Sequence, residues 1–338
     1  MSSPTMLFLI GAPRSGTTML ERMLSAHSAI RGGAEPHLLT PLAHLGVWKQ
    51  VDKAPYDHIV ASIGQRDFVA ALPGGEADYW AACRAYCDTL YGRSMAGSGR
   101  SVCLDKTPEY ATVLPFITKV YPDARYIVLT RHPLAVFTSF ANSFFDGDFR
   151  VANQHDPLLD RYVPALAAFL RQAAVPHEHV RYEALVSDPE ATMRRVLAHV
   201  GVPYEASVLN YAEHASAVSG LGDPLGVARH GGPSTESVHK WADAIVASAD
   251  KLNYLRSLVA RLDPEDLSAI GYPLNRLWEP VERRLGRAAA PIERQRINRY
   301  LIQRKLIVHG RAMVRSSTLL QRLLRQVRLA CDVLLREY

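Results

Sequence analysis

The most constraining feature of this sequence is a glycine loop that lies between a short apolar run and a helical pattern. The loop Gly11-Ala12-Pro13-Arg14-Ser15-Gly16-Thr17-Thr18 follows the apolar run 7–10 and opens a helical pattern over 17–26. Its spacing matches the phosphate loop G-x-x-x-x-G-K-[ST], with Thr17 in the place of the lysine. Backbone N–H groups, the helix N-terminus and the two threonine hydroxyls can all hold a phosphate. We therefore expect a strand–loop–helix unit that binds an anion.

The missing lysine narrows the choice of ligand. In nucleotide triphosphatases that lysine reaches a γ-phosphate, whereas here Arg14 places a forked cation early in the loop. The loop therefore favours a nucleotide with one phosphate in the cradle and a group other than a triphosphate beyond it. A P-loop kinase or nucleotide hydrolase is the alternative from a different class.

The rest of the body alternates β-rich runs with helical stretches. Runs at 101–104, 125–130 and 179–182 are separated by helical segments, and 183–200 has the pattern of one amphipathic helix. This alternation is typical of an α/β fold, here a P-loop-type parallel sheet flanked by helices.

The chain is 48% hydrophobic, which excludes general disorder. No apolar run matches an export signal or a membrane span, and four cysteines form no disulfide framework, so we expect a cytoplasmic protein.

A second group of polar residues follows the run 125–130. Arg131 stands at the carboxyl end of this predicted strand, the edge where open α/β sheets bind ligands. Pro133 suits the first turn of a following helix, and Ser139 could face the same pocket.

Together these two regions resemble the signature regions of sulfotransferases that use 3′-phosphoadenosine-5′-phosphosulfate (PAPS). The resemblance runs from about Leu7 to Trp241 and is to both the tyrosylprotein branch and the branch linked to bacterial polyketide synthases. It implies that the loop binds the 5′-phosphosulfate and that other residues bind the 3′-phosphate and the nucleotide. The residues that it assigns to PAPS are Pro13, Arg14, Ser15, Gly16, Thr17, Thr18, Arg131, Ser139, Tyr182 and Lys240.

Sulfuryl transfer to a hydroxyl needs a base and cations near the transferring group. Lys106 follows the predicted strand 101–104 and can reach the bridging oxygen, and its Asp-Lys-Thr-Pro run resembles the family's lysine loop. Glu35 lies in a stretch similar to the one that carries the catalytic glutamate of tyrosylprotein sulfotransferases, although the run reads Gly-Ala-Glu instead of Gly-Glu-Glu. His37 is the alternative base, and Arg14 completes the predicted catalytic set. A sulfuryl group carries less charge than a phosphoryl group, so we predict no metal.

The acceptor is the open part of this interpretation. The resemblance to the polyketide-linked branch favours a small-molecule, lipid or carrier-bound alcohol, whereas the glutamate spacing suits a peptidyl tyrosine as the alternative acceptor.

The charge of the chain is concentrated at its C-terminal end. Residues 281–338 hold 14 Lys/Arg against four acidic residues, a net charge of +10, so residues 1–280 carry −4 and no nucleic-acid partner is expected. We predict a sulfotransferase domain over 1–285 and a basic helical extension over 286–338, with apolar residues at helical spacing from Leu320 to Leu334. This extension could pack on the body or on a second subunit in a homodimer, or bind an acidic carrier protein or an anionic membrane surface.

Overall fold

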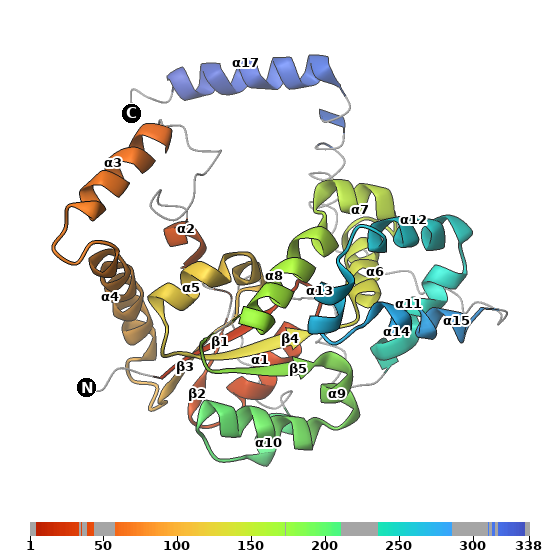
Figure 1. The fold of residues 1–338 in the computed structure, drawn as a ribbon, viewed down its shortest axis with the longest axis horizontal. Helices are drawn as coiled ribbons and strands as arrows, with labels where there is room; N and C mark the ends of the chain where they lie inside the picture. Colours follow the sequence, from red (N-terminus) through yellow and green to blue (C-terminus); the bar gives the residue numbers. More distant parts are fainter. Residues whose placement is uncertain are drawn as a thin grey trace.

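A five-stranded parallel sheet forms the centre of the protein, in the order β2-β3-β1-β4-β5 (Figure 1). The computed structural model describes residues 5–33, 35, 39–43, 58–172, 174–210, 236–285, 310, 313–314 and 317–334. The strands are β1 (Thr5–Gly11), β2 (Ile30–Arg31), β3 (Val102–Asp105), β4 (Arg125–Thr130) and β5 (His177–Arg181). The predicted α/β class is confirmed.

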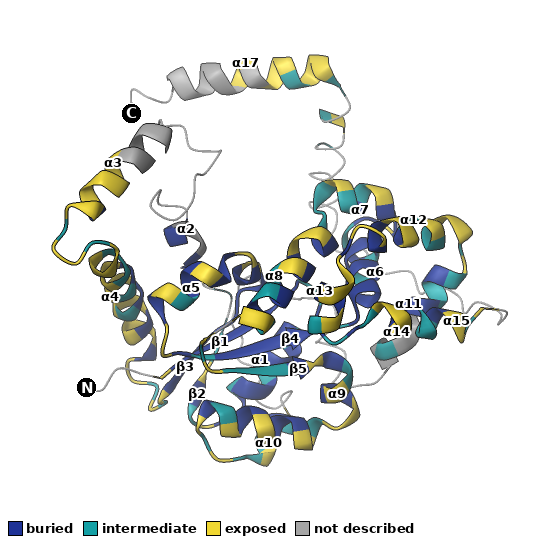
Figure 2. Ribbon diagram, in the orientation of Figure 1, coloured by how far each residue is buried: buried dark blue, intermediate teal, exposed yellow. Residues whose placement is uncertain are grey.

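Two apolar cores lie on opposite faces of this sheet. Because successive side chains of a strand point to opposite faces, β1 places Phe8 and Ile10 in one core and Leu7 and Leu9 in the other. Both faces of the central strands are therefore buried, which explains why they are continuously apolar (Figure 2).

The helices are divided between the two cores. One core packs against α1 (Thr17–Ser25), α9 (Tyr182–Ser187), α10 (Pro189–Val200) and the 3₁₀ turn η2 (Ala206–Leu209). The larger core packs against α4 (Glu76–Met95), η1 (Pro108–Val113), α5 (Leu114–Val120), α6 (Pro133–Phe144), α7 (Phe149–His155), α8 (Leu158–Gln172), α11 (Glu236–Val246), α12 (Ala249–Val259), α13 (Pro264–Ala269), α14 (Leu274–Leu277) and α15 (Glu279–Glu282). The larger core also includes residues of α2 (Leu39–Ala43), and the remaining described helix of the body is α3 (His58–Ala70).

The chain changes direction next to β1. After β1 it enters α1 on one face, whereas β3 and β4 lead into η1 and α6 on the other face. Such a switch point leaves room for ligands beyond the carboxyl ends of the strands. The glycine loop after β1 lies at this point.

The structure corrects two predicted boundaries. The strand expected at 179–182 spans His177–Arg181 instead, and Tyr182 begins α9. The single helix expected over 183–200 is divided at Asp188, because Pro189 suits a first helical turn but not a helix interior. Asp188 caps α10 by accepting a hydrogen bond from the Ala191 N–H at 3.1 Å.

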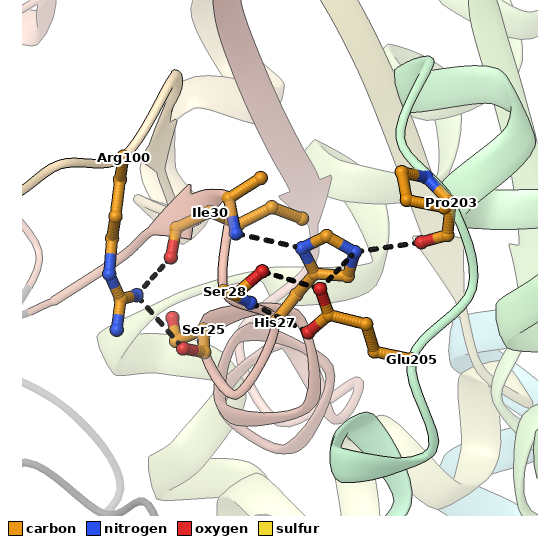
Figure 3. A network of polar contacts seen from close by, with 8 residues as sticks. Ser25, His27, Ser28, Ile30, Arg100, Pro203 and Glu205 are labelled. Carbon is orange, nitrogen blue, oxygen red and sulfur yellow. Dashed lines mark hydrogen bonds and ion pairs between the residues drawn. The ribbon is translucent and has the colours of Figure 1, made fainter.

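A polar network fixes the turn between α1 and β2 (Figure 3). The buried His27 ring lies 2.7 Å from the Pro203 carbonyl oxygen through Nε2 and accepts the Ala29 N–H through Nδ1 at 3.0 Å. Glu205 accepts hydrogen bonds from the backbone and hydroxyl of Ser28. The network ties the end of α1 to the segment that follows α10.

The described part of the C-terminal extension contains one long helix, α17 (Thr318–Leu334), which lies apart from the helices that cover the sheet (Figure 1). The predicted junction at 286–291 lies outside the described residues. Among the residues that are described, no helix combines the length and the apolar character needed to cross a bilayer.

Candidate active site

The glycine loop forms a tight cradle between β1 and α1. The N–H and the hydroxyl of Ser15 both donate to the Ala12 carbonyl oxygen, at 3.1 and 2.7 Å. Arg14 has a positive φ of 70°, an uncommon conformation for a residue with a side chain, and Gly16 has a φ of 100°. Alternating left- and right-handed residues turn successive N–H groups toward one point, which produces an anion-binding concavity. No acidic residue occupies the first turn of α1.

Gly16 is needed both for its backbone conformation and for close packing. A Cβ at this position would lie 2.6 Å from Cδ2 of Tyr182, the first residue of α9. The ring of Tyr182 is buried against the loop. The structure thus brings the predicted nucleotide contact Tyr182 directly to the predicted phosphate loop.

Arg131 and Arg14 connect the loop to the end of β4. The Arg131 guanidinium donates from Nη1 to the Arg14 carbonyl oxygen at 3.2 Å and lies 4.3 Å from the centre of the Tyr182 ring. Burial lowers the pKa of Arg131 from its ordinary value, because a desolvated cation is disfavoured. The Arg14 side chain donates from Nε to the Ser139 hydroxyl on α6 at 3.3 Å. The predicted residues of the two phosphate sites therefore lie in one connected cluster.

Lys106 and Glu35 form an ion pair in which the lysine is buried. Lys106 directly follows β3, and Glu35 lies four residues after β2, so both stand at the carboxyl edge of the sheet. Sequence reasoning selected each residue separately, and the structure brings the two together.

A buried carboxylate anchors the segment of Lys106. Asp105 accepts hydrogen bonds from the hydroxyls of Tyr91 (2.5 Å), Tyr110 (3.0 Å) and Thr107 (3.1 Å). The Tyr110 hydroxyl also accepts the N–H of Leu39 at 3.1 Å. This network joins the segment that carries Lys106 to the segment that follows Glu35. The sequence analysis did not assign a role to Asp105, although its place in the Asp-Lys-Thr-Pro run was a signal.

The site residues appear along the edge in the order of the strands. Glu35 follows β2, Lys106 follows β3, the loop follows β1, Arg131 follows β4 and Tyr182 follows β5. The acid and the lysine therefore lie on one side of the loop, and the arginine and the tyrosine lie on the other.

The surroundings of Arg131 include residues that sequence reasoning missed. The N–H of His132 donates to Glu183 at 3.1 Å, and Glu183 also accepts the Tyr272 hydroxyl at 2.5 Å. The His132 ring lies 4.4 Å from that of Trp241 and 3.0 Å from the Leu277 carbonyl oxygen through Nε2. His132 is the N-cap residue of α6.

Two predicted residues lie outside the described part of the site. His37 is not described, and only the backbone of Lys240 is described, within α11.

Comparison with known proteins identifies the family of this chain. A family model described as "Sulfotransferase family" matches residues 4–206. The nodulation protein NoeE of Sinorhizobium fredii is 30% identical over 220 residues, covering 59% of this chain and 50% of that protein. Protein-tyrosine sulfotransferase 1 of Danio rerio is 24% identical over 220 residues, covering 64% of this chain and 58% of that protein. The alignments thus span little more than half the length of these curated relatives.

A solved structure has the same fold. The sulfotransferase domain from the curacin biosynthetic pathway aligns with a TM-score of 0.50 at 21% identity, covering 77% of this chain and 99% of that domain. The family match covers more than half of the sequence, including every strand and the whole of the described candidate site except the α11 side. The chain therefore belongs to the sulfotransferase family.

Proposed function

We propose that this chain transfers a sulfuryl group from PAPS to a hydroxyl of a small-molecule, lipid or carrier-bound alcohol. The observation that carries the proposal is the order of groups along the sheet edge, with an acid–lysine pair on one side of the phosphate loop and Arg131 on the other. This order suits a donor that has an anion at each end of its nucleoside and an acceptor that approaches from the side of Glu35.

The residues present fit such a donor. The left-handed backbone of Arg14 and Gly16 forms the cradle in which the residues Pro13–Thr18 would hold the 5′-phosphosulfate. Arg131 is a partly buried cation whose desolvation a 3′-phosphate would offset, with Ser139 close to Arg14 in the same cluster. Tyr182 would pack against the nucleotide side of the loop. When bound, the donor supplies the sulfuryl group and leaves as adenosine 3′,5′-bisphosphate.

The acid–lysine pair would carry the chemistry. Glu35 takes the proton of the acceptor hydroxyl while that oxygen forms its bond to sulfur. Lys106 and Arg14 neutralise the charge that develops on the bridging oxygen as its bond to sulfur breaks. His37 is the alternative base. The cytoplasm is the proposed setting, because Cys83, Cys87 and Cys103 are buried free thiols.

The donor site is tested by binding of adenosine 3′,5′-bisphosphate, measured as a thermal shift. Arg131→Ala should weaken binding at least tenfold, because a buried charge-assisted contact is lost. Arg125→Ala removes an arginine from the other end of the same strand and should leave binding unchanged. Tight binding of ATP together with no response to the bisphosphate would support the kinase or hydrolase alternative and reject the proposal.

The reaction is tested by transfer of radiolabelled sulfate from PAPS to a panel of alcohols and tyrosine peptides. Glu35→Gln should lower kcat by about 10²–10⁴-fold, the usual contribution of a general base. Transfer to tyrosine peptides alone would replace the alcohol by a protein-tyrosine acceptor, the activity for which the Danio rerio relative is named. Full activity of both Glu35→Gln and Lys106→Ala would reject the assigned roles.

A further inference from the structure

The helix α17 has a broad apolar face that is exposed to solvent. Five aliphatic side chains on it are between 37% and 76% exposed: Leu319, Leu320, Leu323, Leu324 and Val327 (Figure 2). At 100° per residue these positions, with Ala330, Cys331 and Leu334, fall within one arc of about 140°. This arc is wider than the narrow seam of a two-stranded coiled coil.

The opposite face of α17 is basic. Arg322 is exposed there, and the helix positions of Arg325 and Arg328 fall on the same face, with Asp332 as the acidic residue among the described positions of the helix. The position of Leu329 also falls on this face, and that of Val333 falls between it and the apolar arc. The surrounding sequence adds to this charge, because residues 281–338 carry a net charge of +10. A second copy of the same extension would bring two strongly positive segments together.

A broad apolar arc below an arginine-rich face is the pattern of helices that lie in a membrane interface. We propose that α17 docks on an anionic lipid surface, with its leucines among the acyl chains and its arginines at the level of the lipid headgroups. Apolar burial and attraction to anionic headgroups then act on the same helix. This inference is independent of the sulfotransferase proposal.

The test is co-sedimentation of the full chain with vesicles of phosphatidylcholine, with and without phosphatidylserine. Leu323→Glu should weaken binding at least tenfold, because it places a carboxylate in the apolar arc. The control Gln321→Glu changes the net charge equally but lies on the polar face, so it should weaken binding by no more than about fivefold, the effect of one charge near an anionic surface. Binding should require phosphatidylserine and decline with added salt.

Several results would overturn the proposal. One is equal loss of binding in the two variants, and another is equal binding to vesicles with and without phosphatidylserine. A dimer in sedimentation equilibrium that Leu323→Glu disperses, without vesicle binding by the parent chain, would show that a second copy covers the face. Binding to a purified acidic carrier protein, but not to vesicles, would assign the face to a protein partner.

A separate observation concerns Glu21, a buried acid on α1 that lies next to Gly32. Glu21 lies one helical turn after Thr17 and accepts a hydrogen bond from the Ser25 hydroxyl at 2.8 Å. A Cβ on Gly32 would lie 2.7 Å from Oε1 of Glu21 and 3.1 Å from a methyl group of Leu104. Gly32 thus allows the chain that leads to Glu35 to pass between Glu21 and the end of β3.

The groups around Glu21 shift its pKa in opposite directions. Burial raises the pKa of Glu21 most strongly, and the nearby carboxylate of Glu35 raises it further, whereas the Ser25 hydrogen bond and the charges of Lys106 and Arg22 lower it. Glu21 therefore lies next to the chain segment that leads to Glu35, and the carboxylates of Glu21 and Glu35 both interact electrostatically with the ammonium group of Lys106.

Within the proposed function, we infer that Glu21 is a positioning residue that holds Lys106 when Glu35 is protonated. As Glu35 takes the acceptor proton, its ion pair with Lys106 loses the negative charge. Glu21 then supplies the counter-charge for the buried ammonium, so that Lys106 stays in place at the bridging oxygen. The proton itself remains on Glu35.

The first test needs no donor or acceptor. In an NMR titration of side-chain carboxyl groups, Lys106→Met should raise the pKa of Glu21, because the cation that lowers it is removed. Ser25→Ala should raise it as well, since the hydrogen bond to the ionised form is lost. An unchanged Glu21 titration in the Lys106→Met variant would show that the two groups are not coupled and would overturn the inference, whatever the enzyme's activity.

The second test uses the pH profile of kcat. Glu21→Gln should lower kcat at least tenfold and leave the affinity for adenosine 3′,5′-bisphosphate unchanged. Ser25→Ala should keep the plateau value of kcat but move the acidic limb of its pH profile to higher pH. A merely structural role of Glu21 would not shift this limb. The control Glu265→Gln, at an exposed position of α13, should match the parent chain. An unmoved limb in Ser25→Ala rejects the role of Glu21, whereas absence of sulfate transfer in the parent chain rejects the proposed function instead.

Discussion

At the scale of single residues, the phosphate loop combines backbone strain with close packing. Arg14 and Gly16 both have positive φ, and an added Cβ at Gly16 would also meet the ring of Tyr182. Backbone strain and close packing each contribute to the cost of a substitution, so a comparison of two glycine variants can measure the two contributions separately.

Gly16→Ala should both destabilise the protein and weaken binding of the bisphosphate. Gly97, with φ 75° and open space around its Cβ position, is the matched control. Gly97→Ala should cost about 1–2 kcal/mol through backbone strain alone, and Gly16→Ala should cost more because Tyr182 must move. Urea denaturation measures both, and equal losses of stability would contradict the close packing at the loop.

Asp105→Asn should destabilise the protein by at least about 2 kcal/mol, since a buried charged acceptor of three hydroxyl groups is lost. Asp123→Asn is the matched control, because it disrupts an exposed pair with Arg84 that contributes at most about 1 kcal/mol. The free energy of unfolding in urea compares the two variants. A smaller effect at Asp105 than at Asp123 would show that the network does not stabilise the fold.

At the scale of elements, the turn between α1 and β2 depends on an ionised carboxylate. The pKa of Glu205 is lowered chiefly because the Ser28 hydroxyl donates to it, with further help from the Ser28 N–H and from His27 (Figure 3). A lowered folded-state pKa means that the stabilisation is fully present above the unfolded value of about 4.3. It is lost as the pH falls through the folded-state pKa.

Glu205→Gln should therefore lower Tm near pH 7, by an amount equivalent to about 1 kcal/mol or less because the group is partly exposed to solvent. The difference from the parent chain should shrink as the pH falls below about 4. Thermal unfolding across this pH range is the measurement, with Glu190→Gln on the surface of α10 as the control. A difference that stays constant with pH would contradict the electrostatic origin.

The elements differ in how far the sequence could predict them. β1, the loop, α1 and β4 carry strong local patterns, and the predicted range 125–130 matches β4. Tyr182 was expected in a strand because it follows a β-rich run, but its ring packs on Gly16, a contact that only the tertiary fold creates. The same reason hid Glu183, whose partners His132 and Tyr272 come from distant segments. Individual site residues could be selected by motif, whereas their order along the edge required the strand order.

At the scale of the whole molecule, the described residues of both apolar cores belong to the body of the chain. Their described buried members extend no further along the chain than Val281. The predicted boundary between 285 and 286 therefore leaves every described core residue on one side.

A chain that ends after residue 285 should unfold cooperatively with a Tm within about 2 °C of the full chain, a shift equivalent to about 1 kcal/mol or less. It should also keep its affinity for adenosine 3′,5′-bisphosphate but lose its binding to anionic vesicles. Calorimetry and co-sedimentation check the two expectations. Loss of cooperative unfolding would show that the extension belongs to the body and that the predicted domain division is wrong.

The hydrogen bond from Arg131 to the carbonyl oxygen of Arg14 has a consequence for how the donor is recognised. The Arg131 side chain, proposed to bind the 3′-phosphate, donates to the backbone of the loop proposed to bind the 5′-phosphosulfate. The Arg14 side chain in turn donates to the Ser139 hydroxyl. These hydrogen bonds connect the two proposed anion sites, and we expect a substitution that displaces one site to displace the other. If PAPS binds as proposed, a substitution at Arg131 that admits a donor without the 3′-phosphate should also weaken binding of the sulfate group.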